Sequence, residues 1–133
     1  MTRIVPPLLL RISSLTLLLS VIFCFSILKA TAAELVMFES DGCEWCEIWN
    51  EEIGGTYSKT TEAEIVPLRR VDIDDDRPVD LKHLTGLVYT PTFIVLQDGR
   101  EVGRIIGYPG EDFFWQLLNE ILTEKGLIAT EGS

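Results

Sequence analysis

Two cysteines separated by two residues, Cys43 and Cys46, are the residues of this sequence best suited to chemistry. Such a pair can bind a metal, form a structural cross-link or exchange electrons. A structural zinc site takes four ligands, and beyond residue 33 the only other cysteine or histidine is His83, so we predict no metal site. A disulfide that closes so short a loop stabilises a fold weakly. The pattern therefore favours redox chemistry, with a structural disulfide as the alternative.

The redox interpretation assigns different roles to the two sulfurs. Residues three apart on a helix are near neighbours, so a disulfide forms with little rearrangement. Cys43 would lie at a helix N-terminus, where free N–H groups and the helix dipole favour the nucleophilic thiolate. Cys46 would lie one turn further on and be more buried. Cys43 would then attack a partner disulfide, and Cys46 would resolve the mixed disulfide.

Around the pair, the sequence predicts one small α/β domain with a mixed central sheet and flanking helices, in the order βαβαββα. Apolar runs on both sides of Asp98-Gly99 are typical of a β-hairpin. Hydrophobic periodicity and glycine or proline breaks set the other bounds. The predicted elements are a strand at 34–39, a helix from 44 that stops at 54–55, a strand at 65–73, a short helix at 79–84, a hairpin within 89–107 and a helix at 110–125.

Aromatic and apolar residues in the predicted helices indicate what they bury. We expect Trp49 and Trp115 in the core and Trp45 on an exposed rim that contacts partners. His83 is expected on a helix surface with no assigned role. The last helix should bury one broad apolar face. That face consists of Phe113, Phe114, Leu117, Leu118, Ile121 and Leu122.

A strand that ends just before the cysteine motif, together with Thr90-Pro91-Thr92 opening the hairpin, resembles the thioredoxin-like superfamily over most of residues 34–125. The resemblance implies a cis bond before Pro91, which would pack against the disulfide. It also implies that Thr90 and Pro91 shape a substrate groove, and that no cofactor is needed beyond the Cys43–Cys46 disulfide. The alternative is an ordinary proline at the first residue of a strand.

The sequence departs from the usual thioredoxin pattern at two places. Glu44 and Trp45 stand between the cysteines instead of Gly-Pro, and Met37 occupies the position of a buried acid. Glu44 or Glu39 could replace that acid in proton transfer, or both could simply be solvated. Negative charge near the pair disfavours a thiolate, which makes the dithiol a better electron donor. We therefore predict a reductant.

Residues 1–33 read as a secretory signal peptide, and residues 34–133 as the thioredoxin-like domain. A basic start, an apolar run at 12–28 and a small-residue patch at 30–33 support this, with cleavage after Ala32 or Ala33. An uncleaved anchor formed by 12–28 is the less favoured alternative, because the run is short for a bilayer span. Cleavage would leave one cysteine pair in an exported compartment, where disulfides persist.

Charge narrows the class of partner. The leader carries three of the 11 basic residues and no acids, so the remaining chain has eight basic and 21 acidic residues and a net charge of −13. Binding to nucleic acid or to anionic lipid requires basic clusters, so we exclude both.

In its predicted export, its acidity and its CEWC motif, the chain resembles, more narrowly, the periplasmic thioredoxins of bacterial sulfur-oxidation (Sox) clusters. This resemblance implies a reductant of the Sox sulfur-carrier complex, or more generally of a partner protein with a disulfide or modified cysteine. It also implies a membrane thiol transporter of the DsbD/CcdA type as electron donor. The alternatives are a disulfide isomerase or oxidase, and a non-catalytic binding or redox-sensing module of the same fold.

Overall fold

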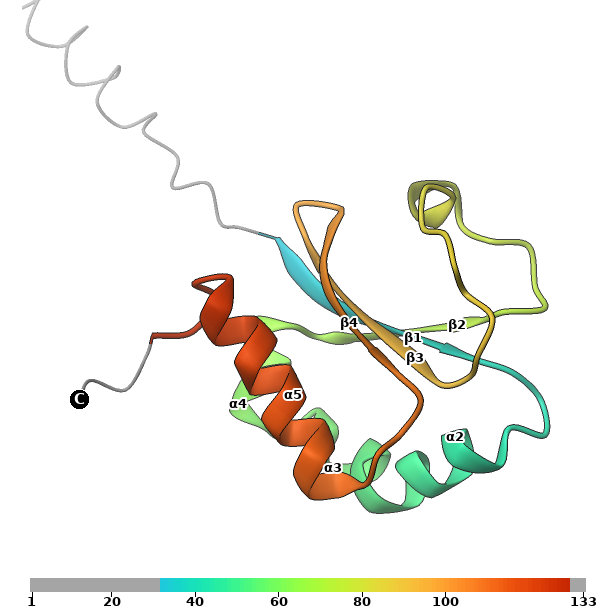
Figure 1. Cartoon of the computed structure of the whole chain (residues 1–133), viewed down its shortest axis with the longest axis horizontal. Helices are drawn as coiled ribbons and strands as arrows, with labels where there is room; N and C mark the ends of the chain where they lie inside the picture. The colour runs from blue at the N-terminus through green and yellow to red at the C-terminus, as the bar shows by residue number, and fades with distance from the viewer. Residues whose placement is uncertain (1–31, 130–133) are drawn as a thin grey trace, which may run out of the picture. The chain divides into compact units, whose positions relative to one another are not determined.

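Four strands form a mixed sheet in the computed structural model, which describes residues 32–129 (Figure 1). The strand order is β2-β1-β3-β4, with β1 parallel to β2 and antiparallel to β3, and with β3 antiparallel to β4. The C-terminal ends of β1 and β4 therefore lie at the same edge of the sheet. The strands are β1 Ala33–Glu39, β2 Leu68–Asp72, β3 Thr92–Gln97 and β4 Arg100–Ile106.

Helical segments lie between some of the strands and after the last one. The first of them runs without a break through three labelled pieces between β1 and β2. These pieces are α2 Glu44–Trp49, the π-helical η1 Asn50–Gly54 and α3 Gly55–Tyr57. The others are α4 Thr61–Ile65, the 3₁₀ turn η2 Val79–Leu81 and α5 Glu111–Glu124.

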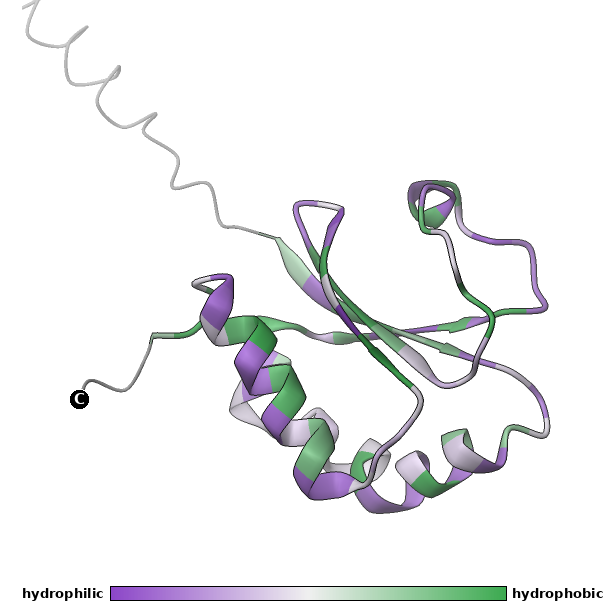
Figure 2. Cartoon of the chain, viewed as in Figure 1, coloured by the Kyte–Doolittle hydropathy of each residue, from purple (hydrophilic) through white to green (hydrophobic). Residues whose placement is uncertain are grey.

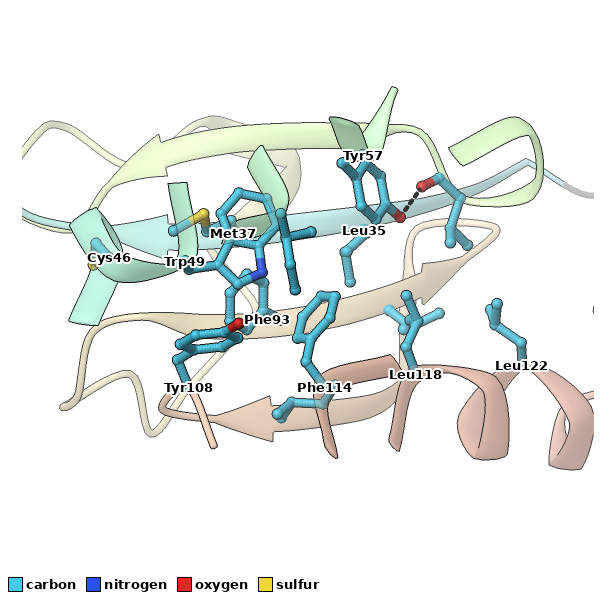
Figure 3. Close-up of a cluster of buried hydrophobic side chains, with 14 residues drawn as sticks. Leu35, Met37, Cys46, Trp49, Tyr57, Phe93, Tyr108, Phe114, Leu118 and Leu122 are labelled. Atoms are coloured by element: carbon cyan, nitrogen blue, oxygen red, sulfur yellow. Dashed lines mark hydrogen bonds between the residues drawn. The ribbon is translucent and has the colours of Figure 1, made fainter. Parts of the chain in front are cut away.

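One face of the sheet packs against α2, α3 and α5 around an aromatic core (Figure 3). Trp49 is fully buried, and its ring centroid lies 5.3 Å from that of Phe93 and 5.8 Å from that of Phe114. Cys46 belongs to the same cluster. The disulfide is therefore attached on one side to the aromatic core.

The other face of the sheet is covered by the segment around η2. Leu81 and Leu84 bury against strand residues that include Phe38, and Arg77 lies over the Phe38 ring at 5.6 Å. Figure 2 shows hydrophobic residues along the strands and hydrophilic ones at the hairpin tip and on much of the outer helix surface. The central strands β1 and β3 are buried on both faces, which explains their nearly continuous apolar sequences.

The fold class and most predicted elements are confirmed, including the hairpin. Its turn has Asp98 at φ 51° and Gly99 at φ 73°, the left-handed pair that a two-residue hairpin turn requires. Gly126, at φ 67°, follows the end of α5. Trp49 is buried as predicted, whereas Trp115 is half-buried and stacks on Tyr57 with centroids 5.9 Å apart.

Three element predictions were wrong in detail. The first helix does not stop at Gly54-Gly55, because both glycines hold right-handed helical dihedrals. A Cβ on Gly54 would lie 3.2 Å from the Trp49 ring, so this glycine permits close packing instead of ending the helix. The short helix predicted at 79–84 is only the 3₁₀ turn η2, and α4 was not expected. β2 begins at Leu68, just after Pro67.

The apolar face predicted for the last helix is too broad. Phe114, Leu118 and Leu122, spaced four residues apart, are fully buried. Phe113 is 61% exposed, and Leu117 is also exposed. A helix on a sheet buries mainly the row that faces the strands, and a neighbouring row extends over the edge.

The predicted signal peptide 1–33, the possible anchor at 12–28 and Cys24 fall outside the described residues, except for Ala32 and Ala33. Ala33 already belongs to β1, and the Ala32 carbonyl accepts a hydrogen bond from the Asp98 N–H at 2.7 Å. Among residues 32–129, no helix has the length and apolar character needed to cross a membrane.

Candidate active site

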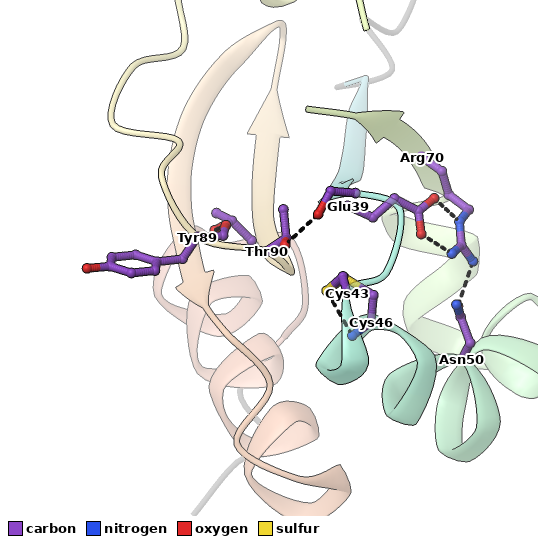
Figure 4. The surroundings of a disulfide bond; sticks show 9 residues. Glu39, Cys43, Cys46, Asn50, Arg70, Tyr89 and Thr90 are labelled. Carbon is purple, nitrogen blue, oxygen red and sulfur yellow. Dashed lines mark hydrogen bonds and ion pairs between the residues drawn. A yellow bond between two sulfur atoms is a disulfide. The ribbon is translucent and has the colours of Figure 1, made fainter. Parts of the chain in front are cut away.

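Cys43 and Cys46 form a disulfide at the start of α2 (Figure 4). The S–S distance is 2.02 Å and the Cα–Cα distance is 5.2 Å. Cys43 is the N-cap residue of α2, and its Sγ accepts a hydrogen bond from the Cys46 N–H at 3.1 Å. The helix start therefore supplies a donor to the sulfur that sequence analysis assigned as nucleophile.

The two sulfurs differ in access. Cys46 is 3% exposed and belongs to the core cluster, whereas Cys43 is half-buried. Cys43 follows Gly42, which has φ 69°, and both Gly42 and Asp41 are exposed. An incoming sulfur can therefore reach Cys43 more easily than Cys46.

The Thr90–Pro91 peptide bond is cis, as the resemblance implied. Pro91 is buried, and its carbonyl accepts a hydrogen bond from the Gly107 N–H at 2.7 Å. The Thr92 hydroxyl donates to the Tyr89 carbonyl at 2.6 Å. The first bond ties the residue before β3 to the residue after β4, and the second holds the segment that leads into β3.

Ser40 joins the loop that contains Thr90 and Pro91, the proline loop, to the loop that runs from Ser40 to Cys43, the cysteine loop. Its Oγ lies 3.0 Å from Oγ1 of Thr90, and its carbonyl accepts a hydrogen bond from the Cys43 N–H at 3.3 Å. Sequence reasoning missed Ser40. The only signal in the sequence was its place in the Ser-Asp-Gly turn, which does not reveal a partner fifty residues away.

A shallow groove is lined by Trp45, which stands between the two cysteines in sequence, and by the segment that joins β4 to α5. Trp45 is 56% exposed, as expected for a rim residue, and Ile106 is 58% exposed. Sequence analysis did not identify the β4–α5 segment as part of the site. The full lining is Trp45, Ile106, Gly107, Tyr108 and Pro109.

Tyr108 links this groove to the π-helical segment. Its hydroxyl donates to Oε2 of Glu52 at 2.5 Å, although the two residues are far apart in sequence. Burial, and next the hydrogen bond to Glu52, raise the pKa of the Tyr108 phenol. Tyr108 therefore stays protonated at neutral pH and holds the β4–α5 loop against η1.

The two acids considered for proton transfer lie in different settings. Glu44 is exposed between the cysteines. Both carboxylate oxygens of Glu39 accept hydrogen bonds from Arg70, one of them from Nε at 2.7 Å. Arg70 also donates from Nη1 to Asn50 at 2.8 Å (Figure 4). Glu39 is thus part of a network that connects β1, β2 and η1.

Met37 is fully buried at the position where the resemblance places an acid. It belongs to the same cluster as Cys46, and its thioether is not a proton acceptor at neutral pH. Among residues 32–129, no group of three or more histidine, cysteine or acidic side chains is arranged to hold a metal ion. His83 is exposed.

The thioredoxin-like domain family matches residues 28–122 of the chain, which include the disulfide, the cis-proline and all four strands. The protein belongs to the thioredoxin-like family. The chain is therefore a thiol-disulfide oxidoreductase that carries a CxxC disulfide, and the fold class predicted from sequence is confirmed.

Individual thioredoxins agree with this assignment. The periplasmic thioredoxin SoxS from Paracoccus pantotrophus, solved in its reduced form, is 37% identical, with a TM-score of 0.67 over 71% of this chain and 99% of that one. A thioredoxin from Chlamydia caviae is 30% identical over 72% of this chain and 89% of its own length. A Thermus thermophilus thioredoxin, 22% identical with a TM-score of 0.53 over 71% of this chain and 76% of its own, shares the fold.

Proposed function

We propose that this thioredoxin-like protein works in the periplasm, mainly as a reductant of a disulfide or modified cysteine in a partner protein. The observation that carries the proposal is the unequal burial of the two sulfurs: Cys43 is half-buried at the N-cap, and Cys46 is 3% exposed. Cys43 is the nucleophile and Cys46 the resolving thiol.

The reaction proceeds in two exchange steps. The Cys43 thiolate attacks one sulfur of the partner disulfide, forms a mixed disulfide and releases the other sulfur as a thiolate. Cys46 then loses its proton and attacks Cys43, which breaks the mixed disulfide and releases the second thiolate. The partner gains two electrons and two protons, and the protein ends with its Cys43–Cys46 disulfide.

The direction of electron transfer rests on local charge. Asp41, Glu44 and Glu47 are all exposed and lie within four residues of Cys43, and they oppose the thiolate that the helix start favours. A dithiol whose thiolate is not strongly stabilised acts as an electron donor to disulfides. We expect a reduction potential near that of thioredoxin, about −270 mV, and far from that of a strong oxidant at about −120 mV. Equilibration with a glutathione buffer measures it. A value near the oxidant end would favour an oxidase or isomerase.

The substrate segment binds in a longer groove that is formed by Trp45, Thr90 and Pro91 and continues into the hollow at 106–109. The hydrogen bond from the Gly107 N–H to the Pro91 carbonyl links the two parts. Backbone groups of Thr90 pair with an extended stretch of the partner, in the manner of an added strand. Glu44 or Glu39 accepts the Cys46 proton, directly or through water.

The Sox sulfur-carrier complex is the proposed partner, and a membrane thiol transporter of the DsbD/CcdA type the proposed electron donor. The likeness to periplasmic SoxS and the leader-like residues 1–33 support this assignment. Export with cleavage after Ala32 or Ala33 is checked by N-terminal sequencing of the periplasmic form.

A Cys46→Ser variant tests the partner, because it cannot resolve its mixed disulfide and so retains the substrate covalently. We expect mass spectrometry of such complexes from periplasmic extract to identify a sulfur-carrier subunit. Recovery of many unrelated proteins would instead indicate a general folding catalyst.

Insulin reduction with dithiothreitol tests the enzyme itself. The wild-type protein should accelerate the precipitation of insulin chains, and Cys43→Ala should abolish the effect. Acceleration that survives in Cys43→Ala would contradict the nucleophile assignment. A wild-type protein without activity would point to a binding or redox-sensing module.

A further inference from the structure

The groove lined by Trp45 and the β4–α5 segment is mostly apolar. Ile106 and Trp45 present more than half of their surface to solvent, and Gly107, Tyr108 and Pro109 complete the lining. Exposed aromatic and aliphatic residues that gather at one place are typical of a protein interface. An apolar side chain next to the partner's cysteine would fill this groove.

Acids dominate the charge close in sequence to the groove lining. The two segments that supply the lining, 41–52 and 105–112, contain seven acidic residues and no lysine or arginine. The residues closest to the lining in sequence are exposed: Asp41, Glu44 and Glu47 before and in α2, and Glu111 and Asp112 after Pro109.

The basic residues of the described domain lie outside these two segments. Arg69 and Arg70 on β2 are engaged in ion pairs with acids of neighbouring elements. Arg104 is bound to Glu101 and to the Thr85 carbonyl. Lys125 follows α5 at its C-terminal end, and α5 starts nearer α2 than it ends (Figure 1). The ion pairs of the described residues therefore involve none of the acids in the two segments.

We infer that this surface selects a partner segment in which an apolar residue next to the cysteine is flanked by lysines or arginines. This inference rests on the proposed function and adds a substrate class to it. Surface charges of one sign attract and orient a segment of the opposite sign, and they repel an acidic one. Charge complementarity thus acts before the sulfur exchange, at the encounter.

Matched peptides test the inference. Each peptide has about twelve residues, long enough when extended to cross the groove. Each carries a leucine beside a single cysteine that is held as a mixed disulfide with the coloured thiol 2-nitro-5-thiobenzoate. The flanking positions are all lysine, all serine or all glutamate. Reduced protein attacks the peptide sulfur through Cys43, releases the coloured thiol, and then releases the peptide thiol through Cys46.

We expect the lysine peptide to react fastest and the glutamate peptide slowest, with about a tenfold spread at low salt that collapses near 1 M salt. Glu47→Gln with Glu111→Gln should narrow the spread. The matched control, Glu64→Gln with Glu124→Gln, removes the same charge from α4 and from the far end of α5 and should leave it unchanged.

A second pair of variants tests the apolar contact. Ile106→Ser should slow the reaction with all three peptides several-fold, whereas Val79→Ser, an exposed aliphatic residue in η2, should not. Unfolding curves confirm that each variant is folded. Equal rates for the three peptides, a spread that salt does not change, or equal effects of the test and control variants would overturn the inference.

Hydroxyethyl disulfide, which is small and uncharged, distinguishes a failure of this inference from a failure of the proposed function on which it rests. If the wild-type protein fails to reduce hydroxyethyl disulfide, the proposed function is wrong. If it reduces hydroxyethyl disulfide but does not discriminate among the peptides, only the charge selectivity is wrong.

Discussion

Ser40 makes the only side-chain hydrogen bond that the described residues show between the cysteine loop and the proline loop, to Thr90 at 3.0 Å. Ser40→Ala removes a bond of about 0.5–1.5 kcal/mol and frees the Thr90 side chain. Because Thr90 lies in the proposed groove, we expect reduction of a protein disulfide such as insulin to slow about threefold. Reduction of hydroxyethyl disulfide, which needs no groove, should stay unchanged.

Two further variants distinguish positioning by Ser40 from general loosening of the site. Ser40→Thr keeps a hydroxyl at this position and should restore the rate. Ser40→Ala combined with Thr90→Val should be no slower than the slower single variant, since both remove one bond. Equal losses with the protein substrate and the small substrate would show that Ser40 only stabilises the fold.

Glu44 is the exposed acid between the two cysteines, at the first position of α2. If its carboxylate accepts the Cys46 proton, Glu44→Gln should slow resolution of a preformed mixed disulfide about tenfold or more at neutral pH. Stopped-flow release of the second thiol measures this step. Glu64→Gln, an exposed acid in the first turn of α4, is the control. A resolution rate equal to that of the control would dismiss Glu44 as the base.

Among the elements, sequence patterns predicted those features that depend only on residues close in sequence. Such features are the Asp98-Gly99 turn, the apolar run of β1 and the cysteine pair. Where packing overrides local preference, prediction failed: Gly54 and Gly55 stay inside a helix, and at Gly54 a Cβ would lie only 3.2 Å from the Trp49 ring. The groove wall at 106–109 and the Ser40–Thr90 bond depend on strand order, which no local pattern contains.

Tyr57, the last residue of the continuous helical segment formed by α2, η1 and α3, is hydrogen-bonded to the chain just before β2. Its hydroxyl is buried and donates to the Val66 carbonyl at 2.8 Å. Tyr57→Phe leaves that carbonyl without this donor, so we expect the free energy of unfolding to fall by about 1–2 kcal/mol. Denaturant titration measures it. Tyr89→Phe, on an exposed ring, should change it by less than about 0.5 kcal/mol.

The same residue gives a prediction for alkaline pH. Burial, and next the charge of Glu62, raise the pKa of the Tyr57 phenol above its ordinary value. The folded state then holds this proton more tightly than the unfolded chain. The resulting stability is fully present below about pH 10, where an unfolded tyrosine titrates, and is lost as the pH rises above that value. Tyr57→Phe should therefore lose less stability than the wild type between about pH 9 and 11, and identical losses would contradict this.

For the whole molecule, charge imbalance decides how salt acts on stability. The chain without residues 1–33 has a net charge of −13, and three of its arginines form ion pairs that are all partly exposed. Exposed pairs contribute about 0–1 kcal/mol each and weaken with salt, whereas repulsion among the excess acids acts over the entire surface. Screening at about 0.5 M reduces both effects, and the excess of acids makes the repulsion the stronger of the two.

We therefore expect the midpoint of urea unfolding to rise as sodium chloride increases from about 0.02 to 0.5 M at neutral pH. Chloride is the suitable anion, because sulfate strengthens apolar burial by itself and would give the same sign for another reason. Near pH 4.5, where protonation of part of the carboxylates brings the net charge closer to zero, the salt effect should shrink. A midpoint that falls with salt at neutral pH would mean that the ion pairs of Arg69, Arg70 and Arg104 outweigh the repulsion.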